Sequence, residues 1–211
     1  MNIGILGPCN VGGALGRRWA QNGHAIVFAS RNPKSVEMKD LVAGAGVNAT
    51  AASAGEAVKQ SDILLLATPW LATKGVVEGA GNLIGKILID ATNPLLPDLS
   101  GLEVGTVNSG GELVAQWAKG AKVVKAFNTV GANIMADSAF PEGKAVVFYC
   151  GDDARAKETV QGLVSELGFD ARDAGPLRQS RLLEPLAHLW ISLAFQQGYG
   201  REFAFSVMKR G

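Results

Sequence analysis

The sequence is poor in the residues from which metal centres and disulfide frameworks are built. It has only two cysteines, Cys9 and Cys150, and two histidines, His24 and His188, with no CxxC pair. These counts argue against a disulfide-stapled fold and against a zinc site, and we expect no bound metal. Each cysteine is most simply a small buried hydrophobic residue.

Charge of one sign and long hydrophobic runs are also lacking. The formal net charge of the 211 residues is only +1, and no basic stripe typical of nucleic-acid binders is present. The longest apolar stretch, 182–195, is interrupted by Glu184, Pro185 and His188 and is too short to span a bilayer. No basic leader precedes the first apolar run at Asn2. We expect a cytoplasmic protein with neither a membrane nor a nucleic acid as partner.

Short apolar runs alternate with helical segments along the whole chain. Strands are predicted at 2–7, 25–30, 62–68, 86–92, 122–128 and 145–151, with weaker ones at 46–51 and 169–175. Helices are predicted at 11–22, 33–44, 53–60, 70–80, 109–119, 154–167 and about 178–197. This order is typical of an α/β protein with a Rossmann-type doubly wound parallel sheet, here with a short C-terminal α/β extension. We treat 1–211 as a single domain, in which 93–111 is the longest loop.

The first predicted strand runs into a glycine-rich turn and a helix in the stretch GILGPCNVGGALGRRWAQNGH, residues 4–24. Gly7 and Gly12 occupy the first and third places of the GxGxxG dinucleotide fingerprint, but Cys9 occupies the second. Cys9 is tolerated there if its φ is negative and its Cβ points away from the phosphates. A reactive thiol at this helix start is the less favoured alternative. The residues predicted to hold the pyrophosphate are Gly7, Pro8, Cys9, Asn10, Val11 and Gly12.

The end of the second strand predicts which dinucleotide binds. Enzymes that use NAD usually place a carboxylate there, to hold the ribose hydroxyls. This chain has Ser30, Arg31, Asn32 and Lys34 and no carboxylate. A guanidinium and an ammonium beside a hydroxyl suit the 2′-phosphate of NADP(H). The alternative is a solvated basic loop.

Three further stretches follow predicted strand ends, where ligands bind in open α/β sheets. We predict that they surround the nicotinamide. The alternative is that these are ordinary turns, punctuated by proline and asparagine. The predicted residues are Ala67, Thr68, Pro69, Ala91, Asn93, Pro94 and Asn128.

With these motifs the chain resembles the NADPH-dependent F420 reductases and, equally, the NADPH-binding domain of the STEAP metalloreductases. The stretches that carry the resemblance are SRNPKS, TPW, VVKAFNTV and GDDARAKETVQGLVSELGFDARDAGPL. The chain departs from the family at Cys9, and it has Asn128 where F420 reductases can have a histidine. The resemblance implies hydride transfer between NADPH and a small-molecule electron acceptor with a flavin-like ring, which is F420, FMN or FAD.

Such a reaction needs alignment of two rings more than acid–base groups, and we assign no catalytic side chain. The Tyr-xxx-Lys pair of short-chain dehydrogenases is absent, because Asp153 and Phe203 follow Tyr149 and Tyr199 by four residues.

The resemblance also divides the chain into a core, 1–128, and an acceptor-side lobe, 129–211. Trp70, Thr129 and Val130 are the predicted acceptor contacts, with Trp190 in the last helix as a further candidate wall. Core packing is the alternative role for each tryptophan. The last helix packs either in the core or in a homodimer interface, which the resemblance also suggests.

Two other functions stay open at this point. One is a diffusible flavin or ferric reductase, and the other is a redox sensor that binds NADP(H) without turnover.

Overall fold

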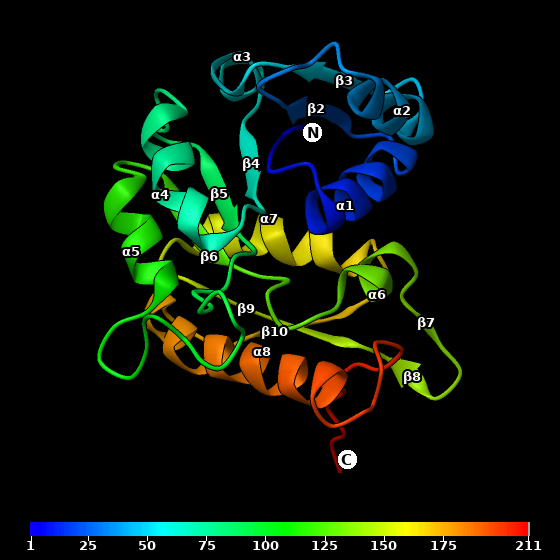
Figure 1. Cartoon of the computed structure of the whole chain (residues 1–211), viewed down its shortest axis with the longest axis vertical. Helices are drawn as coiled ribbons and strands as arrows, with labels where there is room; N and C mark the ends of the chain where they lie inside the picture. Colours follow the sequence, from blue (N-terminus) through cyan, green and yellow to red (C-terminus); the bar gives the residue numbers. More distant parts are fainter. Residues whose placement is uncertain (211) are drawn as a thin grey trace.

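The computed structural model describes residues 1–210, and within them eight strands form one sheet in the order β10-β9-β6-β5-β4-β1-β2-β3. Helices cover both of its faces (Figure 1). The sheet strands are β1 (Asn2–Leu6), β2 (Ala25–Ala29), β3 (Ala49–Ala52), β4 (Ile63–Leu66), β5 (Ile87–Asp90), β6 (Lys122–Lys125), β9 (Val146–Gly151) and β10 (Asp170–Asp173). The doubly wound α/β prediction is therefore confirmed.

The helices begin where the sequence offers a cap. The side chains of Ser35, Ser53, Ser109 and Asp153 each accept a hydrogen bond from the backbone amide three residues later, as N-caps do. The helices are α1 (Asn10–Gln21), α2 (Val36–Ala45), α3 (Ala54–Gln60), α4 (Trp70–Gly79), α5 (Gly110–Trp117), α6 (Ala132–Ala136), α7 (Ala154–Ser165) and α8 (Ser180–Phe195). A 3₁₀ turn, η1 (Leu177–Gln179), precedes α8.

The central strands are buried from end to end. Every residue of β4 is buried, and so are four of the five residues of β1. Two apolar clusters fill the space between this sheet and the helices, one on each face. Parallel strands covered on both sides need such continuous apolar runs, which explains why the sequence showed them without alternation.

One edge of the sheet differs from the all-parallel prediction. β9 pairs antiparallel with β6, and β10 runs parallel to β9. Between β6 and β9 the chain forms only the five-residue α6 and a small hairpin, β7 (Ala139–Phe140) and β8 (Gly143–Lys144). A parallel connection needs a crossover of a dozen or more residues, usually a helix, and α6 is too short to supply one.

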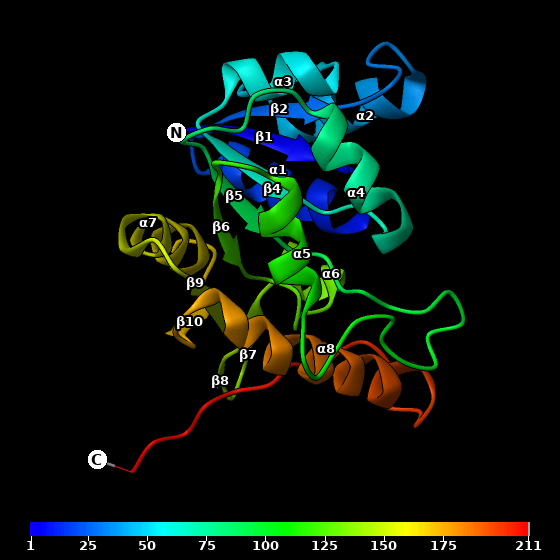
Figure 2. The same ribbon diagram turned by 90° about the vertical axis from the view of Figure 1, so that its left-hand side faces the viewer.

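The C-terminal part lies against the sheet edge at which β5 and β6 end. Figures 1 and 2 both show α8 packed on this side, with the long loop after β5 between it and the central strands. That loop runs from 91 to 109 and contains no helix or strand. It has one isolated β-bridge, between Leu95 and Leu102. No helix among residues 1–210 is both long and apolar enough to cross a membrane.

Candidate functional site

The turn between β1 and α1 has room only for glycine at two places. Gly7 has φ +100°, and a Cβ there would lie 2.5 Å from the backbone oxygen of Ala67. A Cβ on Gly12 would lie 2.7 Å from Cγ2 of Ile5, so α1 could not pack this close to β1. These are the geometric roles that the first and third glycines of a dinucleotide turn perform.

Cys9 immediately precedes α1 and meets the first of the two conditions set by the sequence, a negative φ. Its φ is −79°, so a side chain is accommodated without strain, and its thiol side chain is exposed. The backbone oxygen of Cys9 accepts a hydrogen bond from Gly13, which starts the helix. The expectation that Cys9 is buried was wrong, because the turn projects from the sheet edge into solvent.

The two cysteines differ sharply in accessibility, which predicts their reactivity. Cys150 is buried in β9 beside Ser180, and burial raises the pKa of its thiol to about 11. The thiolate is the reactive form, so titration of the native protein with a disulfide reagent should release one equivalent rapidly. A second equivalent should appear only after denaturation. A Cys9→Ser variant is the control and should release none while folded; rapid release from that variant would show that Cys150 is accessible.

The loop after β2 carries the predicted basic cluster on the surface. Arg31, Asn32 and Lys34 are exposed, and Ser30 is half-buried at the strand end. The Ser30 hydroxyl oxygen accepts a hydrogen bond from the amide of Asn32 at 3.1 Å, which leaves the hydroxyl hydrogen free to donate. The loop then leads into α2, which Ser35 caps.

A cleft of about 390 Å³ opens beside the glycine turn. Residues at the ends of β4 and β5 line it together with the turn, namely Cys9, Asn10, Val11, Ala67, Thr68, Pro69, Trp70, Ala91, Thr92 and Asn93. The structure thus gathers three of the five predicted segments in one place, and Asn128 and the loop after β2 are not part of the cleft lining. The basic loop after β2 lies along the same sheet edge, outside this cleft.

Asn93 and Asn128 form a reciprocal pair next to the cleft. The Asn93 side chain donates to the backbone oxygen of Asn128 at 2.9 Å, and the Asn128 side chain donates to Asn93 Oδ1 at 3.0 Å. Asn128 also donates to the backbone oxygen of Leu183 at 3.0 Å. Both of its amide hydrogens therefore have acceptors. Its buried Oδ1 has no partner within the described residues.

The predicted acceptor contacts are only partly placed at the cleft. Trp70 lines it, with its ring 5.5 Å from that of Trp117. Val130 is buried in the main apolar cluster, and Thr129 is buried as well. Trp190 is also buried and stacks on Phe203, which fits the core-packing alternative.

A second, larger groove of about 720 Å³ runs along α1 between α2 and α6. It shares Cys9 and Asn10 with the cleft, so the two cavities meet at the glycine turn. Arg17 and Arg201 contribute exposed guanidinium groups to its lining. A bulky planar molecule therefore has space on either side of the turn.

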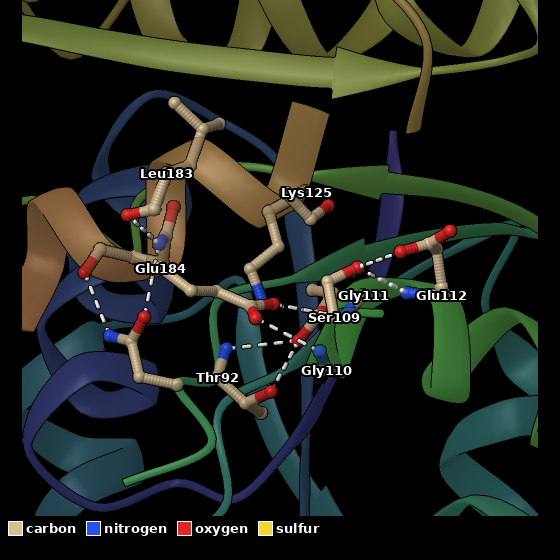
Figure 3. Close-up of polar contacts among 12 residues, drawn as sticks. Thr92, Ser109, Gly110, Gly111, Glu112, Lys125, Leu183 and Glu184 are labelled. Atoms are coloured by element: carbon tan, nitrogen blue, oxygen red, sulfur yellow. Dashed lines mark hydrogen bonds and ion pairs between the residues drawn. The ribbon is translucent and has the colours of Figure 1, made fainter. Parts of the chain in front are cut away.

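Beneath the cleft lies a buried charged cluster that the sequence reasoning missed (Figure 3). Lys125 Nζ lies 2.9 Å from Asp90 Oδ2 and 2.7 Å from Glu184 Oε1, and the lysine side chain is completely buried. Burial opposes the charge on Lys125, but the two carboxylates outweigh it and its pKa is raised. A signal was available, because Asp90 and Lys125 end short strands with apolar central residues and Glu184 lies within an apolar helix.

Comparison with known proteins agrees with this geometry. Residues 2–94 match the family described as NADP oxidoreductase coenzyme F420-dependent. Over these 93 of the 211 residues, the chain is similar to the F420-dependent NADP oxidoreductases. This similarity indicates an NADP-dependent oxidoreductase, and the resemblance stated from the sequence is confirmed.

Relatives of this oxidoreductase differ in how much of their length it covers. It is 28% identical to the F420-dependent NADP reductase of Methanocaldococcus jannaschii over 206 residues, which cover 92% of each chain. A solved structure from Arthrobacter sp. FB24, proposed to be an F420-dependent NADP reductase, is 28% identical with a TM-score of 0.89 and covers 99% of this chain and 100% of its own. The rat metalloreductase STEAP3 is 31% identical over 87% of this chain, which spans only 36% of that protein.

Proposed function

We propose that this oxidoreductase transfers a hydride between NADP(H) and a deazaflavin or flavin ring, F420, FMN or FAD. The observation that supports it best is the basic, carboxylate-free loop at the end of β2. This loop shares a sheet edge with the glycine turn and the cleft. A 2′-phosphate needs that charge, whereas a bare ribose hydroxyl does not.

The residues fit NADP(H) along this edge. In the proposal, the amides at the start of α1 hold the pyrophosphate, and Gly7 lets the turn pass against the backbone of Ala67, where a Cβ would not fit. Arg31, Lys34 and the Ser30 hydroxyl hold the 2′-phosphate. Asn93 lines the cleft and is paired with Asn128, so the two side-chain amides lie next to the place proposed for the nicotinamide carboxamide.

This arrangement supports hydride transfer by aligning the nicotinamide with the acceptor ring. Bound NADPH would supply the hydride. The chain's task is to exclude water and hold the two rings face to face, and ring alignment of this kind accounts for most of the rate in such a step. We assign the acceptor side to residues 129–211 and to Trp70 at the cleft, and a homodimer joined through exposed apolar side chains of α8 belongs to the same proposal.

Anaerobic oxidation of NADPH, followed by absorbance with F420, FMN and FAD offered separately, tests the proposal. We expect turnover with at least one of the three rings, and faster turnover with NADPH than with NADH. F420 is favoured because two relatives carry that coenzyme in their names. Tight binding of NADPH without oxidation by any ring would contradict the proposal and favour a non-catalytic sensor.

A flavin-dependent ferric reductase is the second candidate, favoured by the 31% identity to a metalloreductase. In that case NADPH would reduce the flavin, and the reduced flavin would pass its two electrons to two ferric ions. Iron reduction that depends on FMN or FAD, without any reaction with F420, would select this candidate over the first.

A further inference from the structure

Asp90 connects the buried cluster to the turn after β5, which lines the cleft. Asp90 is the last residue of β5, and one of its oxygens binds Lys125. Its other oxygen accepts hydrogen bonds from the Thr92 amide at 2.9 Å and the Thr92 hydroxyl at 2.7 Å. The turn that carries Asn93 is therefore tied to Lys125 through a single carboxylate.

Glu184 connects the same lysine to α8 and α5 (Figure 3). Its carboxylate also accepts hydrogen bonds from the amides of Gly110 and Gly111, both at 2.9 Å, at the start of α5. The residue before it, Leu183, provides the backbone oxygen that holds the Asn128 side chain. A shift of α8 would therefore move the oxygen that Asn128 binds, because Leu183 and Glu184 are neighbours in that helix.

Asn128 depends on this support because the backbone of the residue before it is strained. The preceding residue, Phe127, is a buried non-glycine residue with φ +65°, a conformation that persists only where surrounding structure enforces it. The Asn128 amide keeps Oδ1 free because Leu183 and Asn93 both supply acceptors to its nitrogen. Loss of the Leu183 contact would let the amide turn over and present a donor in place of an acceptor.

We propose that Lys125, Asp90 and Glu184 form a positioning cluster that fixes the Asn93–Asn128 pair, and through it the nicotinamide ring. The inference rests on the proposed function. These three residues touch no cofactor atom themselves; they act by setting where β5, β6 and α8 place the two asparagines. A displacement of about 1 Å can cost on the order of 100-fold in rate, so small movements of α8 matter.

The decisive variant is Glu184→Gln, with Glu112→Gln as its matched control. Glu112 also joins α5 to α8, through a bidentate ion pair with Arg181 that is partly exposed and away from the asparagines. We expect Glu184→Gln to lower kcat by about 10- to 100-fold, while KM for NADPH changes by less than about 2-fold because the adenosine end is held elsewhere. Glu112→Gln should leave both constants unchanged.

A double-mutant cycle separates positioning from general loss of structure. If Glu184 acts through Asn128, then Glu184→Gln should lower kcat no further in an Asn128→Ala background. Additive effects would overturn the proposal, and so would equal effects of Glu184→Gln and Glu112→Gln. If Glu184→Gln does not fold, Asp90→Asn replaces it in the same cycle, because its amide oxygen can still accept from Thr92.

The cycle also distinguishes failure of this inference from failure of the proposed function. Wild-type turnover with a flavin-like ring tests the function, and the variants test positioning. If the wild type binds NADPH without turnover, the fluorescence of the bound nicotinamide serves as the readout. It should then shift in Glu184→Gln and not in Glu112→Gln. A wild type that binds no NADPH would contradict the function, and the positioning role with it.

Discussion

Replacing Arg31 with serine should weaken NADPH binding by about 10- to 100-fold and leave NADH binding nearly unchanged. The estimate follows from a charge-assisted hydrogen bond, which contributes about 1.5–3 kcal/mol, at about 1.4 kcal/mol for each factor of ten. Arg31 is exposed at the end of β2, and no carboxylate among residues 30–35 competes for its guanidinium. Its planar donors match a phosphate in a way that Lys34 alone cannot. Titration of each dinucleotide by its fluorescence measures both affinities.

Arg155→Ser is the matched control for that experiment. Arg155 is also exposed, but it lies on α7 rather than in the loop after β2. Its removal takes the same charge from the protein, so it reports any general electrostatic effect on an anionic ligand. Equal losses in the two variants, or unchanged NADPH affinity in Arg31→Ser, would show that the loop does not read the 2′-phosphate.

The parts of the fold that the sequence predicted are those set by local rules. The β1–turn–α1 unit could be located because positive φ and close packing restrict Gly7 and Gly12 to glycine. The helix starts at Ser53 and Ser109 could be placed because a serine followed by glutamate three residues later is a sequence signal for a helix N-terminus, and each serine side chain accepts from the amide of that glutamate.

The direction of β9 could not be predicted in the same way. The alternation of apolar runs is identical for a strand that continues a parallel sheet and for one that reverses. The choice depends on how the 20 residues between β6 and β9 pack, and that packing is non-local. The side chain of Trp190 illustrates the same limit, because its burial against Phe203 depends on where α8 docks.

In the candidate site, too, the positions set by strand order could be predicted, and the contacts made by distant segments could not. Strand ends meet at one edge in any doubly wound sheet, so Asn93 and Asn128 could be placed near each other from their positions alone. Their reciprocal hydrogen bonds and the buried lysine behind them depend on Glu184, which a distant helix brings in. A charged residue inside an apolar strand is nevertheless a readable signal, since an unpaired buried charge is too costly to persist.

Replacing Lys125 with methionine should therefore destabilise the protein more than any other substitution considered in this chain. Methionine fills a similar volume, but Asp90 and Glu184 would remain buried without a cation between them. Breaking a buried ion pair in this way costs about 3–5 kcal/mol, a large part of the 5–15 kcal/mol that stabilises a typical domain. Urea unfolding followed by tryptophan fluorescence measures the loss.

The loss should also depend on pH, with a sign that identifies its cause. In the variant, one carboxyl group must hold a proton to relieve the repulsion, so its pKa in the folded state is raised. A carboxyl group whose pKa is higher in the folded state than in the unfolded state stabilises the fold at low pH. That stabilisation is lost as the pH rises through the folded-state pKa. The free energy of unfolding that Lys125→Met loses relative to the wild type should thus be smaller at about pH 5 than at about pH 8. In the wild type the raised pKa of Lys125 keeps its contribution intact up to about pH 10.

Lys122→Met provides the comparison, because it removes the same residue type from the same strand. Lys122 Nζ lies 3.1 Å from Asp153 Oδ2, but this pair is 40% and 34% exposed, and exposed pairs contribute at most about 1 kcal/mol. The two variants therefore differ in burial rather than in charge. Two outcomes would show that Lys125 does not stabilise the two buried carboxylates. One is a Lys125→Met variant no less stable than Lys122→Met, and the other is a loss in free energy of unfolding that grows as the pH falls. The account of α8 as a helix held in place by a buried charge would then have to be abandoned.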